Sequence, residues 1–243
     1  FDSARQCILR WFFASNSGTS MPTQSAADGT LIHSLAERFP CGPRSAVMDA
    51  LEEEIRAMGV DEGQAASKIR MDHLREMASA LGEYLEQSAQ MGSCSDPNEN
   101  VQVEVPFDVP ISSVHIRGRI DRMELEGKGV RIIDFKTGKK GNKTGAKKDP
   151  DHPQLALYQL AVEQLGYEVL GAELKYLGYG DVRTISQDPL DPETRADWIS
   201  QLDEIGQKMK GPSFIATPSD EACQYCEFAR SCPAREQGKR SVE

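Results

Sequence analysis

The segment from 118 to 138 constrains the fold most, because it places two carboxylates in predicted strands, the second of which is otherwise largely apolar. Asp121 lies in the run Gly-Arg-Ile-Asp-Arg, and Asp134 lies in the run Ile-Ile-Asp-Phe-Lys, which ends at Lys136. Burying a carboxylate in an apolar strand is costly unless a partner compensates its charge. Asp134 and Lys136 are two residues apart, so both side chains point to the same face of a strand. If the strand of Asp121 lies beside them, two carboxylates and one ammonium converge.

Two interpretations account for this pattern. Carboxylate oxygens are the ligands that Mg²⁺ or Mn²⁺ prefers, so the three residues predict a metal site. The alternative is a structural salt bridge between Asp134 and Lys136, which an isolated Asp-x-Lys in a strand favours. The sequence around the pattern must therefore decide between the two.

The order of predicted elements indicates an α/β core preceded by a helical region. Apolar periodicity predicts helices at 1–14, 29–39, 44–58, 63–90, 154–165 and 192–209. Alternation and apolar runs predict strands at 101–106, 114–123, 130–135 and 172–179. We therefore expect a single domain over 1–243, with a helical annex at 1–100, a catalytic core at 101–210 and a cysteine-rich tail at 211–243.

The net charge of −10 by itself argues against nucleic-acid binding, but the charge is unevenly distributed. Between 131 and 148 there are seven basic residues and one acidic residue, so this window carries +6 and the remainder −16. A basic strip on an acidic body can bind phosphate, because screening limits charge interactions to about 8–10 Å. The alternative is a solvated loop, but the adjacent Asp-x-Lys motif favours phosphate binding. The lysines expected to contact DNA are Lys139, Lys140, Lys143, Lys147 and Lys148.

Four motifs, in order and spacing, resemble the RecB-like branch of the PD-(D/E)XK nucleases. They are Gly29 with His33, the run 118–122, the run 134–138, and Gln154 with Tyr158. The resemblance extends from about residue 7 to 233. It implies a restriction-endonuclease-like core, in which helices flank a mixed sheet, and a Mg²⁺- or Mn²⁺-dependent deoxyribonuclease.

The resemblance also implies roles for single residues. Asp121, Asp134, His33 and the main-chain carbonyl of Phe135 would be metal ligands. Lys136 would position or polarise the attacking water, or take its proton. Gln154 and Tyr158, one helical turn apart, would line the active site and touch DNA or Lys136. Arg122 would contact DNA. Glu104 matches only a family tendency for an acid on the preceding strand, and we do not include it in the predicted site.

Three cysteines are clustered near the end of the chain, at Cys223, Cys226 and Cys232. Three thiolates need a fourth partner to close a metal site, and Cys7 is the candidate. The set resembles the iron–sulfur cysteines of AddB-type and CRISPR-associated nucleases, which implies a [4Fe–4S] cluster. A Cys₄ zinc site is the alternative. Cys41 and Cys94 match no motif, and we expect them to be free thiols, as in an intracellular chain.

Among such nucleases, the chain most resembles the C-terminal nuclease domain of the actinobacterial AdnA/AdnB helicase–nucleases. We therefore expect a module for double-strand break resection and repair, in the bacterial cytoplasm near the nucleoid, without a membrane segment. The first residue is not Met and the sequence has no ATP-binding phosphate loop, so we expect the motor elsewhere in a longer polypeptide or complex. The expected partners are single-stranded DNA, this motor and a second helicase–nuclease subunit.

Two alternatives to this function remain. The first is a stand-alone iron–sulfur exonuclease of the CRISPR type. The second is a catalytically silent DNA-binding scaffold, against which the intact Asp121, Asp134 and Lys136 count.

Overall fold

The computed structural model describes residues 1–17, 23–92, 94, 100–138, 146–178 and 181–239. The chain forms two compact units. One, the terminal unit, comprises Phe1–Met21, Pro110–His115 and Pro192–Glu243. The other, the sheet unit, comprises Pro22–Val109 and Ile116–Asp191. The expectation of a single domain with an annex, a core and a tail stays a prediction, and each unit is described separately below.

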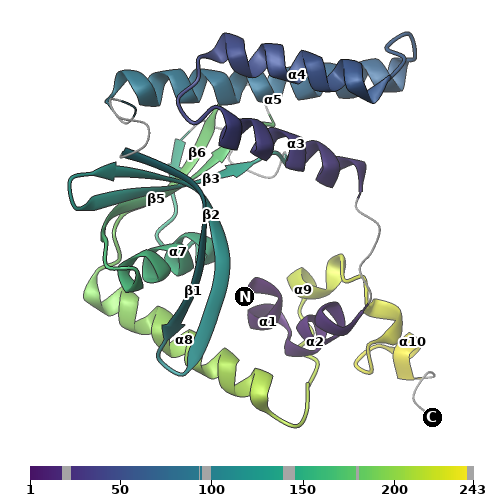
Figure 1. Ribbon diagram of the computed structural model, residues 1–243. Helices are drawn as coiled ribbons and strands as arrows, with labels where there is room; N and C mark the ends of the chain where they lie inside the picture. Colours follow the sequence, from purple (N-terminus) through teal and green to yellow (C-terminus); the bar gives the residue numbers. More distant parts are fainter. Residues whose placement is uncertain (18–22, 93, 95–99, 139–145, 179–180, 240–243) are drawn as a thin grey trace. The chain divides into compact units, whose positions relative to one another are not determined.

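A mixed six-stranded sheet forms the centre of the sheet unit, and its strand order is β1-β2-β3-β5-β6-β4 (Figure 1). The strands are β1 (Val101–Ile111), β2 (Val114–Glu126), β3 (Gly129–Lys136), β4 (Ala146–Lys148), β5 (Glu168–Tyr176) and β6 (Arg183–Gln187). β2 and β3 pair antiparallel, whereas β3 and β5 pair parallel. The central strand β3 is nearly all buried, as is usual for a strand covered on both faces.

Helices cover both faces of this sheet, so the predicted α/β architecture is confirmed. On one face, α3 (Gln24–Arg38), α4 (Arg44–Met58) and α5 (Ala65–Gln90) form an apolar core with Ile133 and Phe135 of β3. The other face packs against α7 (Pro153–Gln164), whose polar side chains reach Asp134. Because neighbouring residues of a strand alternate between faces, Phe135 and Asp134 point to opposite helical layers.

The helix α3 begins five residues earlier than predicted. Thr23 caps it, because the Thr23 hydroxyl accepts a hydrogen bond from the Ala26 N–H at 3.2 Å. This is the usual arrangement for a threonine at a helix start. The strand β4 lies in a segment for which no strand was predicted, and it pairs parallel with β6. Neither strand was predicted, because three and five residues are too few to show a clear alternation.

In the terminal unit, the predicted helix at 1–14 is two helices, α1 (Asp2–Gln6) and α2 (Ile8–Asn16). Cys7 separates them with an extended backbone, at φ −159° and ψ 111°. The unit also contains α8 (Pro192–Lys210), α9 (Asp220–Gln224), the 3₁₀ helix η1 (Ala229–Ser231) and α10 (Glu236–Lys239). Ala4, Ile8 and Ile205 form its small apolar core.

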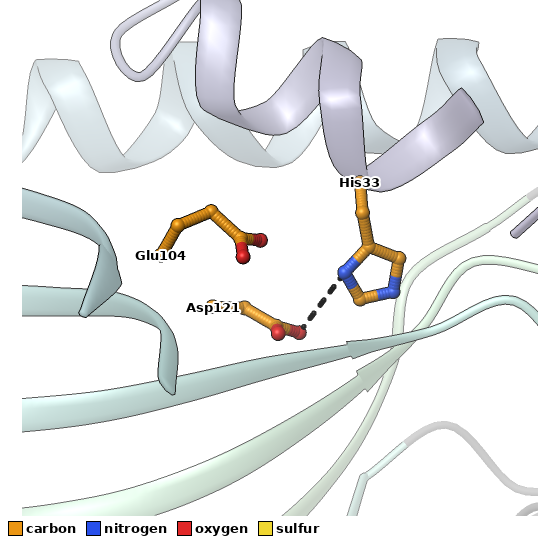
Figure 2. A group of neighbouring side chains, drawn as sticks. All are labelled: His33, Glu104 and Asp121. Carbon is orange, nitrogen blue, oxygen red and sulfur yellow. Dashed lines mark ion pairs between the residues drawn. The ribbon is translucent and has the colours of Figure 1, made fainter. Parts of the chain in front are cut away.

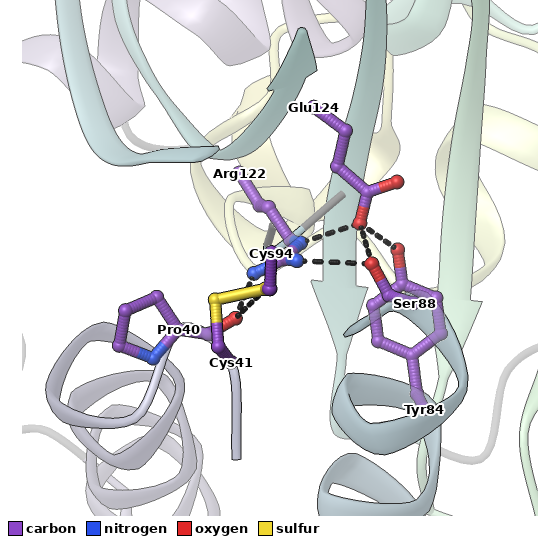
Figure 3. The surroundings of a disulfide bond; sticks show 7 residues. All are labelled: Pro40, Cys41, Tyr84, Ser88, Cys94, Arg122 and Glu124. Carbon is purple, nitrogen blue, oxygen red and sulfur yellow. Dashed lines mark hydrogen bonds and ion pairs between the residues drawn. A yellow bond between two sulfur atoms is a disulfide. The ribbon is translucent and has the colours of Figure 1, made fainter. Parts of the chain in front are cut away.

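Cys41 and Cys94 form a disulfide with an S–S distance of 2.00 Å, so the expectation of two free thiols was wrong (Figure 3). Cys41 follows α3 and Cys94 follows α5. The packing of these two helices brings the Cα atoms of the two cysteines to 5.8 Å from each other. Their separation of 53 residues hid this proximity in the sequence.

Within the described part of the chain, no helix combines the length and apolar character needed to cross a membrane.

Candidate metal centre

Three side chains with metal-ligand chemistry meet at one edge of the sheet unit (Figure 2). His33 comes from α3, Glu104 from β1 and Asp121 from β2. One ligand atom of each lies within 4.8 Å of the others. His33 Nδ1 is 3.4 Å from Asp121 Oδ2. The structure thus brings the predicted residues His33 and Asp121 together and adds Glu104, which the sequence analysis left out.

Glu104 reaches this group through an unusual backbone conformation. Its φ is +51°, in the left-handed region that residues other than glycine rarely adopt, least of all within a strand. Such a conformation costs free energy and is concentrated at functional sites. In sequence, Glu104 is simply an acid in an alternating strand, so no pattern distinguishes it. The conformation that turns it toward His33 is a property of the folded strand.

Asp134 and Lys136 form the second part of the site. Asp134 is only 3% exposed, and Lys136 Nζ lies 2.6 Å from Asp134 Oδ2. On α7, Gln154 Nε2 donates to Asp134 Oδ1 at 2.8 Å, and the Tyr158 hydroxyl donates to the same oxygen at 2.9 Å. Gln154 also donates to Tyr158 at 2.9 Å. The predicted residues of β3 and α7 are therefore in direct contact.

A main-chain hydrogen bond joins the two parts. The N–H of Phe135 donates to Asp121 Oδ2 at 2.7 Å, so the carboxylate of β2 lies against the strand that carries Asp134. The antiparallel pairing of β2 with β3, in which Arg122 faces Ile133, produces this proximity. His33, Glu104, Asp121, Asp134 and Lys136 therefore form one site.

The electrostatics of this site favour a cation. Burial raises the pKa of the Asp134 carboxyl and the negative charge of Asp121 adds to the effect, while the Lys136 ammonium opposes it. The hydrogen bond that His33 donates to the Asp121 carboxylate raises the pKa of His33, against the effect of burial. Asp134 Oδ2 is buried with no hydrogen-bond donor of good geometry, and Lys136 is its ion-pair partner. Carboxylate oxygens and one imidazole suit Mg²⁺ or Mn²⁺, so the residues fit such an ion.

Arg122 does not fit its predicted contact with DNA. Its side chain is fully buried and donates to Glu124 Oε1 at 2.7 Å, to Ser88 Oγ at 3.1 Å and to the carbonyl of Pro40 (Figure 3). A guanidinium enclosed in this way has no surface to offer a phosphate. The contact of Arg122 with DNA was implied by the family resemblance alone. The Arg122 side chain in fact points away from that of Asp121, as neighbours in a strand do.

The lysine strip is described only in part, because Lys139, Lys140 and Lys143 lie outside the described residues. Lys147 and Lys148 lie on β4 and are exposed. Lys148 Nζ pairs with Asp188 Oδ2 at 2.7 Å, and Lys147 lies 3.9 Å from Asp149. Both belong to the sheet unit, and their contact with DNA stays a prediction.

In the terminal unit, all four predicted cysteine ligands line a single pocket. They are Cys7, Cys223, Cys226 and Cys232. The break between α1 and α2 puts Cys7 there, and the Thr217 N–H donates to its sulfur at 3.5 Å. Gly238 packs directly on the backbone of Cys232, because an added Cβ would lie 2.1 Å from its carbonyl oxygen. The pocket is thus built from both ends of the chain.

Comparisons with known proteins agree with this geometry. The chain matches the model of the PD-(D/E)XK nuclease superfamily over residues 1–233. It is 26% identical to the Gene 69 protein of Mycobacterium phage L5 over 58% of this chain and 46% of the phage protein. For the Gene 69 protein of Mycobacterium phage D29 the identity is 23%, over 56% and 49%. The chain therefore matches about half the length of these relatives.

A solved structure of a candidate exonuclease from Eubacterium rectale is also similar. It has 11% identity and a TM-score of 0.47, with 92% of this chain and 80% of that protein covered.

Proposed function

Since the chain belongs to the PD-(D/E)XK nuclease superfamily, we propose that it is a Mg²⁺- or Mn²⁺-dependent deoxyribonuclease. The observation that carries the proposal is the convergence of Asp121, Asp134 and Lys136 with His33 at one point of the sheet. A structural salt bridge between Asp134 and Lys136 would not require His33, Glu104 and Asp121 around it.

In the proposed mechanism of phosphodiester hydrolysis, different residues of the site bind the metal ion and position the attacking water. His33, Glu104, Asp121 and Asp134 would hold the cation, with the carbonyl of Phe135 as a further ligand. A divalent cation bound there lowers the pKa of a water molecule and neutralises charge that develops on the phosphate oxygens.

Lys136, held by Asp134, would orient the attacking water or take its proton. Gln154 and Tyr158 keep the Asp134 carboxylate in place through Oδ1 and leave Oδ2 directed to the site.

A cleavage assay tests this proposal. End-labelled single-stranded DNA and RNA of one sequence are incubated with the protein in Mg²⁺, in Mn²⁺ and in excess EDTA. We expect DNA products with either metal and none in EDTA. Cleavage in EDTA would overturn the metal-dependent mechanism. DNA binding without cleavage in either metal would favour the silent scaffold, and cleavage of RNA alone would reassign the substrate.

We further propose that Cys7, Cys223, Cys226 and Cys232 hold a [4Fe–4S] cluster, with Cys₄ zinc as the alternative. Two features support it: the four thiols line one pocket, and the Thr217 N–H donates to the Cys7 sulfur. Such hydrogen bonds to ligand sulfurs accompany iron–sulfur sites. The role would be structural, because the ligands join the first two helices to the last segment of the chain.

We also propose that this nuclease works as the cutting module of a helicase–nuclease in break resection and repair. The run from Cys7 to Trp11 and the cysteine tail resemble those of the AdnA/AdnB nuclease domain, and this resemblance supports the proposal. The isolated chain should then cut single-stranded DNA in preference to blunt duplex, and a motor subunit with ATP should make duplex a good substrate. Efficient digestion of blunt duplex without ATP would instead favour a stand-alone exonuclease.

A further inference from the structure

The strand β2 carries a row of exposed arginines that ends at the metal centre. Arg117, Arg119 and Asp121 occupy alternate positions, so their side chains lie on one face of the strand. The side chains of Arg117 and Arg119 are 77% and 64% exposed. Successive members of the row are about 6.6 Å apart, twice the rise per residue of a strand. This interval is close to that between phosphates along an extended nucleic-acid strand.

Each arginine forms an ion pair with a carboxylate of the neighbouring strand β1. Arg117 Nε lies 2.8 Å from Asp108 Oδ2, and Arg119 Nη1 lies 3.2 Å from Glu104 Oε2. Exposed ion pairs such as that of Arg117 with Asp108 contribute only about 0–1 kcal/mol, and in both pairs the guanidinium is mostly exposed, so a phosphate can compete with the carboxylate. A guanidinium has five N–H donors, more than one carboxylate can use, and it binds phosphate in a bidentate manner. The carboxylates therefore orient the arginines without blocking them.

Two contacts fix the backbone of β2 at Gly118 and Arg119. The Arg119 carbonyl lies 3.2 Å from the Tyr158 hydroxyl, whose single proton is shared between this carbonyl and Asp134 Oδ1. Gly118 packs so closely on the ring of Phe107 that an added Cβ would lie 2.5 Å from it. The side-chain partner of Arg119, Glu104, is itself part of the metal group. Arg119 thus lies at the rim of the metal centre, and Arg117 lies one step further out.

We propose that Arg117 and Arg119 bind two successive phosphates of the nucleic-acid strand that is being cut, so that the strand runs along β2 into the metal centre. The proposal rests on the proposed nuclease function and adds the path of the substrate. It also replaces the contact predicted for Arg122, which belongs to the same strand but is buried.

The test is the salt dependence of binding to a single-stranded DNA oligonucleotide in EDTA, measured by fluorescence anisotropy for the parent and for Arg117→Gln, Arg119→Gln and the double variant. For single strands, the slope of log K against log salt changes by about 0.7 per phosphate contact. We expect a slope shallower by about 0.7 in each single variant and about 1.4 in the double variant. Lys128→Gln is the matched control, since Lys128 is an exposed cation in the turn at the other end of β2, and its slope should equal that of the parent. Slopes of the arginine variants equal to those of the parent and of Lys128→Gln would overturn the proposal.

Cleavage supplies a second readout. Arg117→Gln should raise KM for long strands and leave kcat unchanged, because Arg117 does not touch the metal group. On an oligonucleotide too short to reach Arg117, the variant and the parent should be equal, and a kcat defect there would contradict the proposed path.

The two proposals fail separately. If the parent does not cut in Mg²⁺ or Mn²⁺ but the slopes change as expected, the nuclease proposal is wrong and the binding path stands. If the parent cuts but the slopes stay the same, the path is wrong and the nuclease proposal stands.

Discussion

The main-chain N–H of Phe135 donates to Asp121 Oδ2 at 2.7 Å, so the carboxylate of one strand is fixed by the backbone of the next. This bond aligns Asp121 with Asp134, whose strand supplies the donor. It also leaves His33 Nδ1 at 3.4 Å from the same oxygen. The site is therefore organised by the pairing of β2 with β3, and its residues can be tested separately.

Asp134→Asn should abolish cleavage in Mg²⁺ or Mn²⁺ and leave DNA binding largely intact. The substitution keeps the shape of the side chain but removes the charge that pairs with Lys136 and that would hold the cation. Product formation and anisotropy on one labelled oligonucleotide measure the two effects. Asp49→Asn is the control, since Asp49 is an exposed carboxylate of α4, outside the site. Robust cleavage by Asp134→Asn would remove Asp134 from the mechanism.

Lys136→Met should lower kcat by about 10²–10⁴-fold, the usual contribution of a positioned acid or base. Metal affinity should not fall, because Lys136 is not a ligand. Calorimetric titration with Mn²⁺ and single-turnover cleavage separate the two effects. A variant that loses metal binding together with cleavage would show that Lys136 only supports the ligands.

Gly29→Ala should weaken metal binding without unfolding the protein. An added Cβ would lie 3.0 Å from Thr137 Oγ1, so the Thr137 side chain or α3 must move by a few tenths of an ångström, and His33 follows Gly29 by one helical turn. Alanine stabilises a helix by up to about 1 kcal/mol relative to glycine. The melting temperature of the variant should therefore not fall, although its metal affinity does.

The double variant Gly29→Ala/Thr137→Ala should recover Mn²⁺ affinity, because it removes the contacting oxygen. Parent-like affinity of Gly29→Ala alone would show that this contact does not position His33.

Anaerobically purified protein should be brown, with broad visible absorbance and about four irons per chain. Cys226→Ala should lose iron and fold stability together, because Cys226 is one of the four thiols around the pocket. Iron analysis, absorbance and thermal melting give the three readouts. A colourless protein with one zinc per chain would replace the cluster with the Cys₄ alternative.

Reduction of the disulfide between Cys41 and Cys94 should lower the free energy of unfolding by about 4 kcal/mol, the loop-closure value for a separation of 53 residues. The measurement is urea unfolding with and without dithiothreitol. The double variant Cys41→Ser/Cys94→Ser should match the reduced parent and should not respond to the reductant. Equal midpoints for the oxidised and reduced parent would mean that the bond adds no stability.

The sequence by itself determined the features that depend on local periodicity. Asp134 and Lys136 share a face because side chains alternate along any strand, and Gln154 lies near Tyr158 because residues four apart adjoin on any helix. The α/β architecture and the boundaries of α4 followed from the same local rules. A few residues of backbone geometry fix these relationships, so they can be read without knowing what the chain packs against.

Only the tertiary structure decided the features that depend on contacts between distant segments. Glu104 joins His33 and Asp121 because its backbone adopts a left-handed conformation, with a φ of +51°, within the strand β1. Arg122 is buried because Ser88 of α5, the carbonyl of Pro40 and Glu124 enclose its guanidinium, whereas Arg119 on the opposite face of β2 is exposed. Cys41 meets Cys94 because α3 and α5 pack side by side. Their positions result from the packing of elements far apart in the chain, and no short window of sequence encodes that packing.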